Sequence, residues 1–174
     1  MTAKSFKPAP ETAASQHLSG EALTHCLGLI DFLRINQFKP RHVAANSWEV
    51  VVPSKNRTHT WKQALRRLRI FNDGTWTITL HFFPEFNEKI TDETVINFVW
   101  NNLDMHKKTC HPNAENTCDL KQSIIIFGKP HDNMCCCCQI KITSPTGDAL
   151  KHIKTLILTA REIIKTSPPR GGAL

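Results

Sequence analysis

Apolar positions recur at the spacing of an amphipathic helix in three stretches of the chain, within residues 19–37, 91–103 and 145–165. Ser19 and Thr91 begin the first two stretches and Ser144 precedes the third, and serine and threonine commonly cap helices. The sequence therefore predicts three helices. Their predicted apolar stripes are Leu23, Leu27, Ile30 and Leu33 in the first, Val95, Ile96, Val99 and Leu103 in the second, and Leu150, Ile153, Ile157, Ala160 and Ile164 in the third.

Alternating apolar and polar residues predict five strands. The first covers residues 47–53, where Trp48 and Val50 alternate with Glu49. The next two, over residues 66–71 and 76–82, form a hairpin, because the turn triplet Asn72-Asp73-Gly74 lies between them. The last two lie over residues 123–127 and 134–143, with a turn predicted at residues 128–133.

The predicted order of elements is α-β-β-β-α-β-β-α. Short strands grouped into hairpins, with helices between the groups, are typical of an α+β domain in which an antiparallel sheet packs with three helices. We expect this single domain over residues 19–165. Residues 1–18 are rich in Pro, Ala, Ser and Thr without apolar periodicity, so they and residues 166–174 are predicted to be flexible tails. For residues 54–64 a short helix competes with an extended strand.

The apolar runs, the cysteines and the net charge indicate in which cellular compartment the protein resides and which kinds of partner it can bind. No stretch approaches the ~18 consecutive apolar residues of a membrane span, and the N-terminus lacks the apolar run of a secretory signal, so we expect a cytoplasmic protein with no membrane partner. Thiols stay reduced in the cytosol, so the seven cysteines indicate packing, metal binding or redox chemistry before disulfides. A net charge of +7 permits contact with nucleic acid or an acidic protein.

Four consecutive cysteines lie in the last predicted strand. Side chains alternate between the two faces of a strand, so Cys136 and Cys138 share a face with Ile140 and Ile142, which we expect to be the core side. There they serve as small buried apolar residues. Cys135 and Cys137 share the other face with Gln139 and Lys141.

Six of the seven cysteines lie between positions 110 and 138, which raises the hypothesis of a structural zinc site. Zinc takes four sulfur or nitrogen ligands, and a loop carrying Cys110 and Cys118 could close on Cys135 with either His111 or Cys137 as the fourth ligand. Such a site would fix a long loop, roughly residues 104–122, that has no predicted secondary structure. Reduced cysteines used for packing, or a Cys110–Cys118 disulfide, are the alternatives.

A catalytic role is less favoured than binding or regulation. A thiol-dependent enzyme or redox sensor would use Cys110 or Cys135, and would need a positioned base to activate the thiol. The chain has no GxSxG, P-loop, GxGxxG or HExxH motif.

A basic stretch lies between positions 55 and 69, with no acidic residue in it. Cations interleaved with an aromatic residue can hold phosphates and stack a base, which makes this stretch the alternative functional site, a nucleic-acid-binding one. The candidate residues are Trp61, Lys62, Arg66, Arg67 and Arg69. A solvated hairpin face, with Trp61 over the sheet edge, or contact with an acidic protein, accounts for the same pattern.

The segments "ANSWEV", "DGTWTI", "FGKPHDNMC" and "SPTGDALKHIKTLI" resemble a group of small uncharacterised bacterial proteins. That group has an N-S-W-x-V strand, a G-x-W hairpin, a cysteine-rich loop, a G-K-x5-C turn and a proline-led final helix. The resemblance covers about residues 23–164. It implies that Cys110, Cys118 and Cys135 match the cysteine positions of the group, and it supplies no activity.

Overall fold

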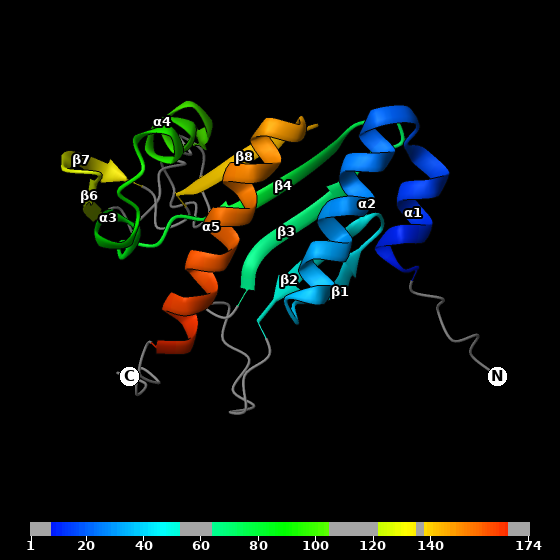
Figure 1. Cartoon of the computed structure of the whole chain (residues 1–174), viewed down its shortest axis with the longest axis horizontal. Helices are drawn as coiled ribbons and strands as arrows, with labels where there is room; N and C mark the ends of the chain where they lie inside the picture. The colour runs from blue at the N-terminus through cyan, green and yellow to red at the C-terminus, as the bar shows by residue number, and fades with distance from the viewer. Residues whose placement is uncertain (1–7, 53–63, 105–121, 135–137, 167–174) are drawn as a thin grey trace, which may run out of the picture.

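The computed structural model describes residues 8–52, 64–104, 122–134 and 138–166 (Figure 1). These residues form five helices, α1 (Pro10–His17), α2 (Gly20–Ile35), α3 (Phe86–Lys89), α4 (Glu93–Asn102) and α5 (Gly147–Thr166). They also form eight strands, β1 (Lys39–Ala44), β2 (Ser47–Val51), β3 (Ala64–Ile70), β4 (Trp76–His81), β5 (Leu103–Asp104), β6 (Gln122–Ile126), β7 (Lys129–Met134) and β8 (Gln139–Thr143).

Six strands pair in an antiparallel sheet of order β1-β2-β3-β4-β8-β5, and β6 and β7 pair separately. The prediction of a mixed α and β fold with an antiparallel sheet is confirmed. The prediction of three helices is wrong, since the described residues contain five. None of the helices in the described ranges combines the length and the apolar composition needed to span a membrane.

The main core lies between the sheet and its helices. In Figure 1, α2 and α5 cross one face of the sheet. On this core face, strand pairing aligns Trp48, Leu68, Ile78 and Ile142 in one row, and all four are buried. They pack in one cluster with Ile30 and Leu33 of α2 and with Ile153 and Ile157 of α5. Full burial of each such side chain contributes about 1.5–3 kcal/mol, so this layer is the main source of stability.

The β3–β4 hairpin has the predicted turn. Gly74 has a φ of +84°, a value that glycine adopts without strain. The Asp73 carboxylate accepts hydrogen bonds from the backbone N–H and the hydroxyl of Thr75, at 3.0 and 2.7 Å. Phe71 N–H donates to the Thr75 carbonyl at 2.8 Å and closes the hairpin.

The N-terminal tail prediction is wrong for residues 10–17, which form α1. Its apolar contacts come from small residues, because Ala13 and Ala14 are buried against the core, and alanine gives only a weak periodicity signal. Glu11 forms an ion pair with Arg34 of α2 at 2.5 Å, and the indole N–H of Trp48 donates to the Pro8 carbonyl at 3.2 Å.

In the predicted C-terminal tail, Thr166 belongs to α5 and residues 167–174 lie outside the described ranges.

The three predicted helices are present as α2, α4 and α5. Their first residues, and the buried residues of α2, differ from those predicted. The buried residues of α2 are Cys26, Leu29, Ile30 and Leu33, because this helix contacts α1 and α5 as well as the sheet. Asp92, not Thr91, caps α4, and the Thr94 hydroxyl and N–H that donate to its carboxylate hold the pKa of Asp92 below its usual value. Ser144 has a φ of +44° and does not cap α5, which begins at Gly147.

Residues 128–133, predicted as a turn, are mostly strand β7. The turn itself is two residues long, because Ile126 pairs with Lys129 and both Phe127 and Gly128 have positive φ, as a type I′ hairpin requires.

Asn87 of α3 attaches this hairpin to the rest of the fold. Its side chain donates to the Ile125 carbonyl at 2.8 Å and accepts from Phe127 N–H at 2.5 Å.

Candidate nucleic-acid interface

The predicted zinc ligands Cys110, His111, Cys118, Cys135 and Cys137 all lie outside the described residues. Within the described ranges, no group of three or more His, Cys, Asp or Glu side chains is arranged to hold a metal ion. The zinc site therefore stays a sequence prediction.

The two described cysteines are both buried. Cys138 packs with Ile126 in a small cluster separate from the main core, in agreement with its prediction as a buried apolar residue. Burial, followed by the negative charge of Glu11, raises the pKa of Cys26 to about 12. Cys26 is therefore protonated at neutral pH and is a core residue, not a nucleophile.

Gln139, predicted to lie on the strand face opposite Ile140 and Ile142, is buried. Its side-chain amide donates to the carboxylate of Asp104 at 3.2 Å. The strand β5, which has only two residues and was not predicted, pairs with β8 at this point and places Asp104 opposite Gln139.

Strand β3 divides the basic stretch between two faces. Arg66 pairs with Val50 and Leu80 and so occupies a register position on the core side, whereas Arg67 and Arg69 occupy the opposite face. Trp61 and Lys62 lie outside the described residues. Of the five predicted nucleic-acid-binding residues, Arg67 and Arg69 are thus the two that the structure places together.

Strand pairing extends this opposite face into a polar surface, here called the cationic face. One row across the sheet runs Arg41, Glu49, Arg67, Thr79 and Lys141. The next row runs Ser47, Arg69, Thr77 and Thr143. Helices α2 and α5 cover the other side of the sheet (Figure 1), and buried residues of α1, α3 and α4 belong to the same core cluster. Sequence reasoning missed Arg41, Ser47 and Lys141, because only the order of strands in the sheet brings them beside Arg67 and Arg69.

Positive charge dominates the cationic face. Arg41, Arg69 and Lys141 are exposed and Arg67 is half-buried. Glu49 forms an ion pair with Arg41. No carboxylate among the described residues pairs with Arg67 or Arg69.

Two hydrogen-bond donors on the cationic face have no protein partner within the described residues. They are the hydroxyl of Ser47, a residue only 5% exposed, and Nε of Arg67. A buried donor without an acceptor costs about 1–3 kcal/mol, so native structures contain few of them. Both donors lie beside Arg69, because Ser47 pairs directly with it and Arg67 is two residues away on the same strand.

Phe71 extends the cationic face at the hairpin end of β3. Its side chain is half-buried and belongs to neither hydrophobic cluster of the described residues. The guanidinium carbon of Arg69 lies 5.8 Å from the centroid of the Phe71 ring, within the range of a cation–π contact. An aromatic ring is thereby held next to Arg69, which has no carboxylate partner within the described ranges.

No family model, curated protein or solved structure matches this chain. The arrangement of residues on the sheet is accordingly the basis for the function proposed below.

Proposed function

We propose that this chain is a nucleic-acid-binding module that holds the sugar–phosphate backbone on its cationic face. The observation that carries the proposal is the row in which Arg41, Arg67 and Lys141 lie on one side of the sheet, with Arg69 beside Arg67. The function is binding, and it requires no catalytic residue.

The spacing of these cations suits a repeating anion. Residues two apart on a strand are separated by about 7 Å, and neighbouring strands by about 4.8 Å. Arg67 and Arg69 can therefore reach adjacent phosphates, while Lys141, two strands away from Arg67, lengthens the positive surface. Neutralising several phosphates releases condensed counterions and supplies most of the affinity in this type of binding.

The chemistry of the face suits the phosphates of a nucleic acid. Guanidinium groups bind phosphate oxygens with two parallel hydrogen bonds, and hydroxyls add further donors. Here Arg69, which has no carboxylate partner among the described residues, lies between Ser47 and Thr77, and Arg67 lies two residues away on the same strand. The hydroxyl oxygens of Thr77 and Thr143 are 3.4 Å apart. An acidic protein partner is the competing outcome of the test.

The test is a fluorescence anisotropy titration of a labelled single-stranded oligonucleotide of about 16 nucleotides, the upper end of a typical site size for a single domain. We expect saturable binding that weakens steeply between about 50 and 200 mM salt, with a slope of about 0.7 per phosphate contact. Absence of binding to the oligonucleotide at low salt would contradict the proposal. If labelled polyglutamate bound saturably under the same conditions, the face would instead be a site for an acidic protein.

The predicted zinc site is independent of this proposal. Its candidate ligands lie outside the described residues, whereas the cationic face consists of described strand residues only. A structural metal would stabilise the loop that carries Cys110 and Cys118 without contributing to the row of cations.

A further inference from the structure

We infer that the nucleic acid bound on the cationic face is single-stranded, with one nucleotide placing its phosphate at Ser47, Arg67 and Arg69 and its unpaired base on Phe71. The inference rests on the proposed function and specifies its ligand.

The phosphate position is indicated by the two unpaired donors. The Ser47 hydroxyl and Arg67 Nε are both covered from solvent and both lack an acceptor among the described residues. A phosphate attracted by the two guanidinium groups would supply acceptor oxygens for both donors once the side chains that cover these two atoms turn aside. Glu49, the nearest carboxylate in the row, does not fill this role, because it pairs with Arg41 on its other side.

The base position is indicated by the half-buried ring of Phe71 beside this phosphate site. Phe71 follows Arg69 by two residues, so the ring lies about 7 Å along the strand from the guanidinium-bearing residue. Arg69 already lies over the ring, and bases stack both on aromatic rings and on guanidinium planes. Phosphate and base of one nucleotide can therefore be held together.

A double helix does not fit this arrangement. Its bases are stacked and paired inside the duplex, so an aromatic ring on a flat sheet reaches only the backbone. A single strand can turn a base onto the ring, and each stacked base contributes to affinity largely independently of its sequence. The inference thus predicts strand preference without marked sequence preference.

The experiment compares four forms of the full chain, namely wild type, Phe71→Leu, Ser47→Ala and the control Phe98→Leu. Phe98 is matched to Phe71, because its ring is also half-buried and stacks on a basic side chain, His152, at 5.0 Å on the helical side of the sheet. The probes are a labelled single-stranded oligonucleotide, the duplex of the same sequence, and inorganic polyphosphate. Melting temperatures of all four proteins are measured alongside.

We expect the wild type to prefer the single strand to the duplex and to polyphosphate. Phe71→Leu should weaken single-strand binding by about fivefold or more, the lower limit for a stacked base, and leave polyphosphate binding unchanged. Ser47→Ala should weaken binding of all phosphate probes without lowering the melting temperature, because it removes a hydroxyl that has no hydrogen-bond partner among the described residues. Phe98→Leu should leave all affinities unchanged.

Two results would overturn the inference and are distinguishable from each other. Equal affinity for strand and duplex, with no effect of Phe71→Leu, would leave the nucleic-acid proposal standing and refute the single-strand assignment. Absence of binding to every probe by the wild type would refute the proposed function itself, and with it this inference.

Discussion

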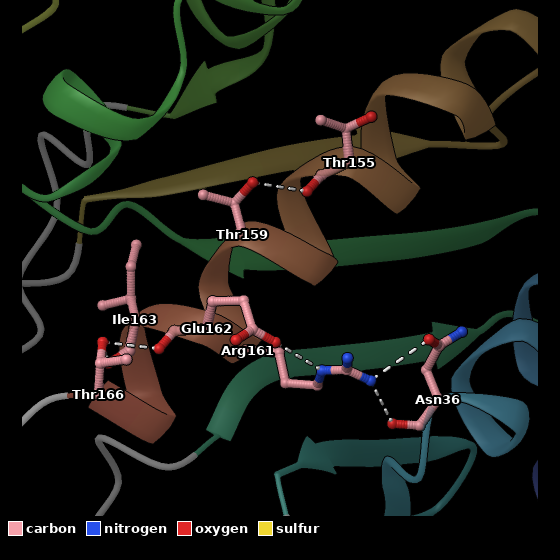
Figure 2. Close-up of polar contacts among 7 residues, drawn as sticks. All are labelled: Asn36, Thr155, Thr159, Arg161, Glu162, Ile163 and Thr166. Carbon is pink, nitrogen blue, oxygen red and sulfur yellow. Dashed lines mark hydrogen bonds and ion pairs between the residues drawn. The ribbon is translucent and has the colours of Figure 1, made fainter.

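Arg161 of α5 holds the end of α2 through Asn36, a residue 125 positions earlier in the chain (Figure 2). Its Nη1 donates to the backbone carbonyl of Asn36 at 3.2 Å and to the side-chain carbonyl at 3.3 Å. Asn36 is the C-cap residue of α2, where helical carbonyls lack partners, and a cation is favoured at this end by the helix dipole. The contact joins the two long helices that cover the core.

Replacing Arg161 by Ala should therefore lower the free energy of unfolding by about 1.5–3 kcal/mol, the range for hydrogen bonds from a charged donor. Equilibrium urea unfolding measures the change. The matched control is Lys165→Ala on the same helix, an exposed position where a change within about 0.5 kcal/mol is expected. Equal losses in the two variants would show that the Asn36 contact does not stabilise the helix pair.

Cys26 should make stability fall at alkaline pH. Burial and then Glu11 raise its pKa to about 12 from 9.0, so the folded state holds the thiol proton more tightly than the unfolded state does. This contribution is complete below about pH 9 and is lost as pH rises toward 12, because the unfolded chain loses its proton first. Subtracting the pH profile of Cys26→Ala from that of the wild type should isolate a falling slope. Identical profiles from pH 8 to 11 would contradict the assignment.

For the predicted zinc site, we expect about one zinc per chain in protein purified without a histidine tag under reducing conditions. Cys110→Ser and Cys135→Ser should each release the metal and lower the melting temperature, because structural zinc binding contributes directly to folding. Cys26→Ala is the control, since that thiol is buried in α2 and should leave the metal content unchanged. Metal-free protein whose melting temperature is insensitive to both serine variants would exclude the site.

Most long elements of the fold were predictable from periodicity, while the short ones were not. The β3–β4 hairpin combines strict alternation with a turn triplet, and α5 buries Leu150, Ile153, Ile157 and Ala160 as the spacing predicts. Strand β1 was not predicted, and it contains Pro40, a residue type that is rare within strands. Proline is tolerated there because β1 is an edge strand that pairs only with β2.

The candidate interface was predictable only in part. Arg67 and Arg69 are visible as a basic run, and strand alternation places them on one face. Their neighbours Arg41, Ser47 and Lys141 come from strands up to about a hundred residues apart, whose order is set by packing of the core and not by any local signal. The unpaired donors at Ser47 and Arg67 depend on three-dimensional contacts and have no counterpart in the sequence.

The central claim is that charge on one face of the sheet binds nucleic acid, and a charge-matched pair of double variants tests it most directly. Arg69→Ala with Lys141→Ala removes two exposed cations from the cationic face, and Lys151→Ala with Lys165→Ala removes two exposed cations from α5. The measurement is the affinity of each protein for a labelled single strand as a function of salt. We predict that the first pair weakens binding and reduces the salt slope by about 1.4, or about 0.7 per lost phosphate contact, while the second leaves both near wild type. Equal weakening by the two pairs would mean that only net charge matters, and would contradict a site on this face.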